Sequence, residues 1–510
     1  MSDTVTIRLK PLGASIEAER GTPLQDLLFP HGVEFPCGGR GQCKGCRVKV
    51  LKGSLPVTSE QSRMLSKAEL EAGWRLSCQC CAGSDLTLEL AQWEAAILSD
   101  NAPFPFTPRD GLGIAVDVGT TTVVAQLLDL RTASVLGVRT ALNSQAKHGA
   151  DVMSRIGFAL RSEAALTELI RRQIGTMIGD LIEGARVSAA RVGSIILVGN
   201  TVMHHLFCGI DCAPLSRFPF EPATDGLVQL LPGELGWDLP KRTSVCFLPC
   251  LGGFVGSDIL AGIVATGIHT STTPACLVDL GTNGEVVVGS RRRLLCCSTA
   301  AGPAFEGARI YMGMRASTGA IVEVHAEGTR LCCKILGDVA PRGICGSGLV
   351  DAAAALLDMG KIQPGGRFTG GERSILLADP VKLSQTDVRE LQLAKGAIAA
   401  GIKMLLAESG LVGDDLGSIY LAGAFGNYIN RASARRIGLI DFPAEKVVPA
   451  GNTALRGAKS ALFRDLSFFE SLANRVEHLS LHGLPGFQDA YVEQMSFPAK
   501  GKRGDQTSDG

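Results

Sequence analysis

The chain has 510 residues, and its 50 basic and 50 acidic side chains give a formal net charge of zero. Hydrophobic residues make up 45% and charged residues 20%, a balance typical of globular proteins, and the length suits two to four domains. The even charge and the lack of a long basic run give no reason to expect a nucleic acid or an anionic membrane as a partner.

Cysteine is frequent, with sixteen in the chain. The first residues lack the basic and then apolar layout of a signal peptide, and no apolar stretch reaches the ~18 residues of a membrane helix. We therefore expect a cytoplasmic protein. Thiols stay reduced in that compartment, so the cysteine content favours metal or redox chemistry over disulfides.

Residues 1–93 carry the pattern of a small α+β domain. Alternating apolar residues predict strands around 5–9 and 86–90. Thr22 followed by Pro23 is typical of a helix start, and three leucines follow at helical spacing. Strands and a helix in this order predict one compact domain.

A glycine-rich loop in this domain holds three cysteines with the spacing C-x5-C-x2-C, namely Cys37, Cys43 and Cys46. Thiolates spaced in this way hold one iron of a [2Fe–2S] cluster and part of the second, and a remote cysteine completes the set. The loop glycines let backbone N–H groups point at the sulfides. A zinc site or plain reduced thiols are the alternatives, although zinc sites usually show paired C-x2-C units. The candidates for the fourth ligand are Cys78, Cys80 and Cys81.

The loop and its flanks resemble the plant-type and adrenodoxin-type [2Fe–2S] ferredoxins. That resemblance implies a β-grasp fold for residues 1–93. It also implies that Cys78 is the fourth ligand.

Residues 94–111 contain three prolines and predict a linker. The pattern then changes to that of an α/β protein. An apolar strand is expected at 114–116, an amphipathic helix over 163–183, and a second buried strand at 195–198.

An internal repeat organises the rest of the chain. Segment 114–121 resembles segment 276–283, since each is an apolar strand followed by Asp, Gly and a polar turn. Two copies predict a duplicated α/β domain with a cleft between its halves, which we assign to 112–245 and 246–482. The polar residues 483–510 predict a disordered tail.

Each repeated turn suits a phosphate group. Glycine permits a tight turn, successive N–H groups form an anion site, and threonine hydroxyls donate to phosphate oxygens. A carboxylate at the strand end suits hydrated Mg²⁺. A turn without a ligand is the alternative for either copy alone. A third glycine-rich segment, 421–427, follows a predicted strand at 418–421 and lets backbone lie flat against a ribose or an adenine.

These segments together resemble the acetate and sugar kinase/Hsp70/actin (ASKHA) superfamily, with Gly346-Ser347-Gly348 opening a connecting helix. The resemblance implies ATP and Mg²⁺ as cofactors. It implies a first phosphate motif of Asp117, Thr120 and Thr121, a second of Asp279, Gly281, Thr282 and Asn283, and an adenosine motif of Gly423, Ala424 and Gly426.

Several side chains remain as further candidates. Asp258 lies where the sugar kinases place a catalytic Asp and could orient an attacking water, or it could cap a helix. Asp151 is a candidate for Mg²⁺ or water, with solvation or capping favoured. Glu306 is a candidate to line the cleft, and the structural alternative is favoured for it to a similar degree. Adjacent histidines His204 and His205 are interpreted as packing residues, since neighbours on a helix point to different faces.

Ten further cysteines lie between Cys208 and Cys345 without any C-x2-C pair. We interpret them as small apolar core residues, with a second cluster as the alternative.

The fusion of the two parts resembles the reductive activators of corrinoid proteins over residues 4–480. Beyond the motifs above, the resemblance is carried by 199–206, 253–256 and 300–309. It implies ATP hydrolysis coupled to one-electron reduction of a Co(II) corrinoid to Co(I). The expected partners are a corrinoid protein of a methyltransferase system, an external low-potential electron donor and, in a homodimer, a second copy of the chain. The linker is shorter than in long members of the family, and no C-terminal C-x2-C-x2-C-x3-C run is present.

Three alternatives remain at this point. A small-molecule kinase with a regulatory ferredoxin is favoured by Asp258. A ferredoxin electron donor, for example to an oxygenase, would need no ATP. An ATP-driven dehydratase activator would need a cysteine pair that bridges a [4Fe–4S] cluster, and the sequence has no convincing pair.

Overall fold

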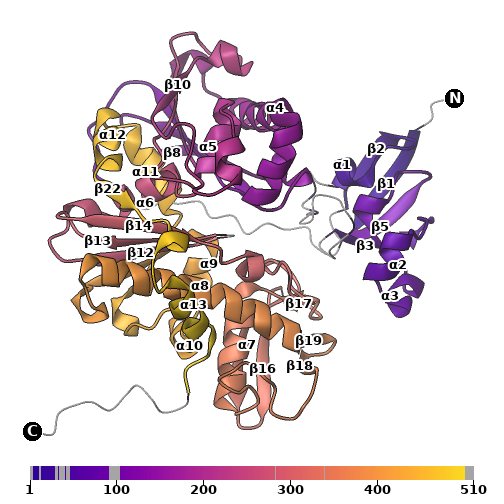
Figure 1. Ribbon diagram of the computed structural model, residues 1–510. Helices are drawn as coiled ribbons and strands as arrows, with labels where there is room; N and C mark the ends of the chain where they lie inside the picture. The colour runs from indigo at the N-terminus through magenta and orange to yellow at the C-terminus, as the bar shows by residue number, and fades with distance from the viewer. Residues whose placement is uncertain are drawn as a thin grey trace, which may run out of the picture. The chain divides into compact units, whose positions relative to one another are not determined.

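The structure is a computed structural model (Figure 1), and it describes residues 4–10, 13–28, 31, 33, 41, 46–90, 104–281, 283–337 and 339–499. The chain divides into two compact units. The first comprises Met1–Ala265 and Thr453–Arg475, and the second comprises Thr266–Asn452 and Val476–Gly510. Among the described residues, no helix is long and apolar enough to cross a membrane.

The N-terminal domain is a five-stranded sheet in the order β2-β1-β5-β3-β4, and β1 and β5 are its parallel pair. Apolar residues on one face, including Ile7 and Leu88, are fully buried, as their alternation predicted. The predicted β-grasp fold is confirmed. The elements are β1 (Thr4–Lys10), β2 (Ser15–Glu19), α1 (Leu24–Leu28), β3 (Arg47–Lys52), α2 (Ser59–Met64), α3 (Lys67–Glu71), β4 (Trp74–Leu76) and β5 (Leu86–Leu90).

The predicted linker is described from residue 104 onwards. The Phe106 ring lies 5.1 Å from the ring of Phe463, and the Phe104 ring lies 5.6 Å from it. This end of the linker is therefore packed against the first unit. Residues 91–103 lie outside the described residues.

The first unit contains a six-stranded sheet in the order β10-β11-β9-β6-β7-β8. On one face of the sheet, Ile114 and Val116 pack into a core with α4 (Val152–Gly184). On the other face, Gly113 lies so close to Leu462 that an added Cβ would come within 2.9 Å of that side chain. The elements are β6 (Leu112–Val118), β7 (Thr122–Asp129), β8 (Val135–Leu142), α4 (Val152–Gly184), β9 (Val192–Val198), α5 (Thr201–Cys208), β10 (Val228–Leu230), β11 (Ser244–Phe247), α6 (Ser257–Thr266), α11 (Thr453–Ala461) and α12 (Ser467–Ala473).

The second unit contains a second six-stranded sheet, in the order β21-β20-β12-β13-β14-β22. The α7 helix begins at Gly346, as predicted. The remaining elements are β12 (Ala275–Leu280), β13 (Gly284–Gly289), β14 (Leu294–Thr299), β15 (Ala320–Glu327), β16 (Arg330–Ile335), β17 (Gly343–Ile344), α7 (Gly346–Asp358), β18 (Ser374–Ala378), β19 (Val381–Ser384), α8 (Gln385–Ser409), β20 (Ser418–Ala422), α9 (Gly423–Tyr428), α10 (Arg431–Arg436), β21 (Val447–Gly451), β22 (Val476–His478) and α13 (Phe487–Met495).

The two large sheets share one topology, which confirms the duplication expected from the repeat. In each, the first strand pairs antiparallel with the second, and the second pairs antiparallel with the third. The chain then returns through helices to a strand that lies parallel to the first on its other side. Equivalent strands are β6 and β12, then β9 and β20, then β11 and β21. The two phosphate-type turns therefore occupy the same place in each half.

The expected boundary between the two halves differs from the structure. The boundary between 245 and 246 falls inside β11, and the first unit continues to Ala265 because α6 follows that strand within it.

The tail expected to be disordered from residue 483 contains α13, which lies beside α8 in Figure 1. Buried Lys395 on α8 donates a 2.7 Å hydrogen bond to the carbonyl of Ser496, and Gln392 donates to that of Met495. These contacts fix the residues at the end of α13 and just after it. Residues 500–510 lie outside the described residues.

Candidate functional site

The ferredoxin domain brings two of the predicted cluster ligands together. The Sγ atoms of Cys46 and Cys78 lie 3.3 Å apart. Two thiolates that share one tetrahedral metal at ~2.3 Å lie ~3.8 Å apart, so a small outward shift would admit an iron between them. The N–H and the hydroxyl of Ser77 both donate to the Cys46 carbonyl, which holds the two segments together. Cys37 and Cys43 lie outside the described residues.

The neighbouring cysteines are placed differently. Cys80 is 5% exposed and packs in the domain core, where burial raises the pKa of its thiol to about 11. A ligand must be a thiolate, so this environment opposes metal binding by Cys80. Cys81 is exposed on an isolated bridge to Pro23. The geometry therefore supports Cys78 as the fourth ligand.

The first phosphate-type turn lies between β6 and β7. Asp117 is the last but one residue of β6, and the N–H of Gly119 donates a 3.1 Å hydrogen bond to the carbonyl of Thr122. The Nδ2 of Asn143 donates to the Gly119 carbonyl at 2.8 Å, and the Nδ2 of Asn200 donates to the Thr120 hydroxyl at 2.8 Å. The turn is thus held from two sides.

Arg155 also supports this turn, although no pattern in the sequence pointed to it. The side chain is fully buried in α4. Its Nε donates to the carbonyl of Gly149 at 2.9 Å, one Nη donates to the Gln145 side chain at 3.3 Å, and the other donates to the carbonyl of Thr120. A buried guanidinium next to a phosphate-type turn both fixes the turn and favours negative charge.

Asp258 lies in the first turn of α6, beside the residues that hold the turn. Its N–H donates to the carbonyl of Gly199 at 3.3 Å, and a Cβ on Gly256 would collide with the Cα of Asn200. Its Oδ1 accepts a 2.9 Å hydrogen bond from the N–H of Ile259. The half-buried side chain thus makes a hydrogen bond at the start of α6, and its backbone contacts the loop whose Asn200 holds Thr120.

The other candidates of the first unit have structural roles. Asp151 is the N-cap of α4, and its Oδ1 accepts a 2.7 Å hydrogen bond from the N–H of Ser154. His204 and His205 are buried in α5, with the His204 ring edge-on to Phe247. Burial, helped by the neighbouring His205, lowers the pKa of His204 to about 3. These two rings are neutral packing residues.

The second phosphate-type turn lies between β12 and β13. Asp279 lies near the end of β12, and the N–H of Gly281 donates a 3.1 Å hydrogen bond to the carbonyl of Asn283. It takes the same place as the turn at Gly119, but it is closed one residue earlier, because Gly119 donates to the carbonyl three residues on and Gly281 to the carbonyl two residues on. Thr282 lies outside the described residues.

The adenosine-type turn lies next to it. Asp279 pairs with Ala422 across the parallel strands β12 and β20. Gly423 has a φ of +81°, and a Cβ there would come within 2.8 Å of Asp279 Oδ1, so only glycine suits this position. A Cβ on Gly426 would come within 3.0 Å of the Leu421 backbone. Ala424 is in α9 between these glycines.

An aromatic pair lies where the starts of α7 and α9 meet. The rings of Phe305 and Phe425 stack at 4.7 Å, and a Cβ on Gly346 would collide with the Phe305 carbonyl. Glu306 follows Phe305 and is half-buried. The starts of α7 and α9 are therefore packed together through this aromatic pair.

Comparison with known proteins identifies all three parts of the chain. Residues 7–83 match the 2Fe-2S iron-sulfur cluster binding domain, residues 112–271 match the RACo middle region, and residues 273–507 match the C-terminal ASKHA domain of RACo. Corrinoid activation enzyme RamQ of Eubacterium limosum is 34% identical over 442 residues, which cover 79% of this chain and 74% of that relative.

The chain belongs to the family of corrinoid activation enzymes. A second member, the [Co(II) methylated amine-specific corrinoid protein] reductase of Methanosarcina barkeri, is 27% identical over 76% of this chain and 77% of its own. The solved structure of a reductive activator for corrinoid, iron-sulfur protein superimposes with a TM-score of 0.69 and 27% identity, over 97% of this chain and 98% of that one.

As a corrinoid activation enzyme, the chain combines a [2Fe–2S] domain with an ASKHA ATPase domain, and its cofactors are the cluster, ATP and Mg²⁺. The residues present fit these groups. Cys46 and Cys78 converge as two ligands of one iron would, and Asp117 and Asp279 stand at equivalent strand ends where a carboxylate suits hydrated Mg²⁺.

Proposed function

We propose that this chain is an ATP-dependent reductive activator that transfers one electron from its [2Fe–2S] cluster to the Co(II) corrinoid of a methyltransferase-system protein and restores Co(I). The observation that carries the proposal is the presence, in one chain, of a ferredoxin fold with a converging thiol pair and two equivalent phosphate-type turns. The family supports it, because its members are named for corrinoid reduction and activation.

The need for ATP follows from redox equilibrium. An acceptor whose potential lies below that of its donor stays oxidised, by tenfold for each ~59 mV in a one-electron transfer. Nucleotide changes this balance only if the nucleotide states of the activator differ in affinity for the partner's states. The ASKHA domain therefore serves to favour a complex in which the cobalt is easier to reduce.

We assign the following roles within this function. Cys37, Cys43, Cys46 and Cys78 hold the cluster. Asp117 and Asp279 hold Mg²⁺, and Asp258 orients the attacking water. The phosphates are bound by Thr120, Thr121, Gly281, Thr282 and Asn283, and the adenosine by Gly423, Ala424 and Gly426. The support for Asp258 is its place beside Gly199 and Asn200, the latter bonded to Thr120.

The wider assignments are also proposals. We divide the chain into a ferredoxin domain (1–93), a linker (94–111) and two ASKHA halves with their boundary near residue 265. An external low-potential donor reduces the cluster, and the chain acts in the cytoplasm, alone or as a homodimer. The cytoplasmic assignment is supported by the sixteen cysteines, a content that suits metal and redox chemistry in a reducing compartment.

A single-turnover experiment tests the electron count. The full chain, prereduced and freed of donor under anaerobic conditions, is mixed with ATP, Mg²⁺ and a Co(II) corrinoid methyltransferase component from the same genome. We expect one cluster to be oxidised for each Co(I) formed, as followed by absorption. Cluster oxidation without Co(I), or a phosphorylated small molecule as the product, would contradict the proposal. An Asp279→Ala variant is the control, since it should keep the cluster spectrum and lose ATP hydrolysis.

A further inference from the structure

A hairpin in the second unit gathers three metal-ligating side chains. Strands β15 and β16 pair antiparallel, and His325 stands opposite Cys332 in their register. Glu327 is two residues beyond His325, so it lies on the same face of the strand. None of these residues belongs to the cluster or nucleotide sites described above.

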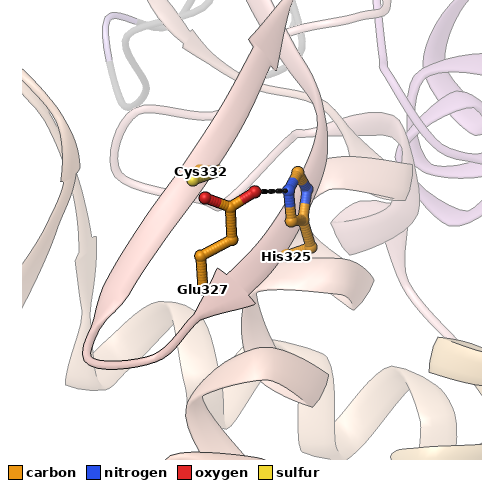
Figure 2. A group of neighbouring side chains, drawn as sticks. All are labelled: His325, Glu327 and Cys332. Atoms are coloured by element: carbon orange, nitrogen blue, oxygen red, sulfur yellow. Dashed lines mark hydrogen bonds and ion pairs between the residues drawn. The ribbon is translucent and has the colours of Figure 1, made fainter.

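The three side chains face one another. Figure 2 shows the Glu327 carboxylate between the His325 ring and the Cys332 sulfur. The Nε2 of His325 lies 3.2 Å from a carboxylate oxygen of Glu327, and the three candidate ligand atoms all lie within 4.8 Å of one another. The side chains of His325 and Glu327 are 64% and 69% exposed. They are therefore accessible and have room to turn.

We propose that His325, Glu327 and Cys332 form a binding site for Zn²⁺. Imidazole, carboxylate and thiolate are the ligands that zinc takes in proteins, at ~2.0–2.3 Å, which puts ligand atoms ~3.3–3.8 Å apart. The His325 and Glu327 atoms already lie at 3.2 Å, and the other spacings need to shorten by at most about 1 Å, which rotation of two exposed side chains supplies. Three protein ligands leave a fourth position for water or an outside ligand.

The charged groups of the hairpin interact with one another. A hydrogen bond to the Glu327 carboxylate raises the pKa of the Cys332 thiol, whereas nearby Arg330 lowers it. Hydrogen bonds from His325 and Cys332 lower the pKa of Glu327. The other charged pair of the hairpin, Lys334 and Glu323, is joined at 2.6 Å.

The adjacent cysteine provides a matched control. Cys333 points to the opposite face, where its Sγ lies 3.5 Å from the carbonyl of Leu377 on β18. A Cys333→Ser change removes a thiol next to the site without removing a ligand. It also tests whether the metal is held by Cys332 alone or by either of the adjacent cysteines Cys332 and Cys333.

The test uses the full chain with its cluster intact, which the visible spectrum verifies. Chelator-treated protein is dialysed against buffered Zn²⁺, and the bound metal is counted. We expect one Zn²⁺ per chain in the wild type and in Cys333→Ser, and an affinity at least about 100-fold lower in Cys332→Ser and His325→Gln, since loss of a mere supporting partner already costs 10–100-fold.

A second readout identifies the sulfur ligand. Co²⁺ in place of Zn²⁺ should give a thiolate-to-cobalt absorption band in the difference spectrum of the wild type against Cys332→Ser. Absence of stoichiometric zinc, or zinc binding that survives both Cys332→Ser and His325→Gln, would overturn the proposal. So would equal loss of binding in Cys333→Ser.

Discussion

The Nδ2 of Asn200 donates a 2.8 Å hydrogen bond to the hydroxyl of Thr120, across a gap of 80 residues in the sequence. The same Asn200 side chain accepts a hydrogen bond from the N–H of Met203 and so caps α5. One residue thus fixes the orientation of a phosphate-motif threonine and the start of a helix. The loop after β9 thereby supports the turn between β6 and β7.

An Asn200→Ser variant separates these two roles. Serine keeps an oxygen that caps the helix but is too short to reach Thr120. A hydrogen bond of this kind contributes ~0.5–1.5 kcal/mol, so we expect kcat/KM for ATP to fall roughly three- to tenfold with little change in Tm. The matched control is Asn430→Ser, since Asn430 caps α10 in the same way. Equal ATPase kinetics in both variants would contradict the role of Asn200.

A Gly423→Ala change should disable the second half-site. The added Cβ would lie 2.8 Å from Asp279 Oδ1 on a backbone with a φ of +81°, so the carboxylate must move. On the proposed role of Asp279 in holding Mg²⁺, we expect a loss of ATP hydrolysis of at least about tenfold, because the displaced carboxylate would no longer position that ion. Gly486→Ala controls for backbone strain, since Gly486 has a φ of +80° and nothing lies within 4 Å of a Cβ added there. A Gly423→Ala enzyme as active as Gly486→Ala would exclude this role of Gly423.

The fourth cluster ligand is tested by two serine variants. Cys78→Ser should abolish the visible spectrum of the [2Fe–2S] cluster, because its Sγ is the one beside Cys46. Cys80→Ser should keep that spectrum and lower stability modestly, since Cys80 packs in the core. The two absorption spectra, recorded on anaerobically purified protein, decide the matter. Loss of the cluster in Cys80→Ser and its survival in Cys78→Ser would reverse the assignment.

Acid should destabilise the first unit through His204. Burial lowers the pKa of this ring from 6.5 to about 3 in the folded chain. Above pH 6.5 His204 binds no proton in either the folded or the unfolded chain, so it lowers the stability of the fold by nothing. As the pH falls from 6.5 towards 3, the unfolded chain binds a proton that the folded one cannot, so stability falls by up to roughly 1.4 kcal/mol per pH unit.

Urea unfolding of wild type and His204→Gln between pH 7 and pH 4 measures this effect. The variant should show a shallower fall of stability with acid, whatever its stability at pH 7. Parallel curves for the two proteins would show that His204 does not carry the acid dependence.

Structural features that depend on residues close together in the sequence could be predicted. Apolar alternation located β1 and β5 of the ferredoxin sheet, and the repeat of Asp, Gly and Thr located β6 and β12, because both signals arise within a few residues. Asp151 as a helix cap and His204 as a packing residue were predicted on the same ground. All of these are confirmed in the described part of the chain.

Contacts between distant segments were not predictable. Arg155 is one arginine in an amphipathic helix, and only the fold places it beside Thr120. The helix α13 has a weak pattern of its own and depends on Lys395 and Gln392 of α8. Cys332 and Cys333 were interpreted as core residues. Strand geometry places them on opposite faces of the hairpin, and only Cys332 lies opposite His325.

The proposed function requires that ATP drive the electron from the ferredoxin cluster to a corrinoid. The most direct measurement is the absorption of Co(I) when the full chain, a low-potential donor and a Co(II) corrinoid methyltransferase component are combined anaerobically, with and without ATP and Mg²⁺. We predict that Co(I) forms with ATP and stays near the level set by the donor potential without it. Equal Co(I) formation in the two samples, or ATP hydrolysis that ignores the corrinoid protein, would contradict the proposal.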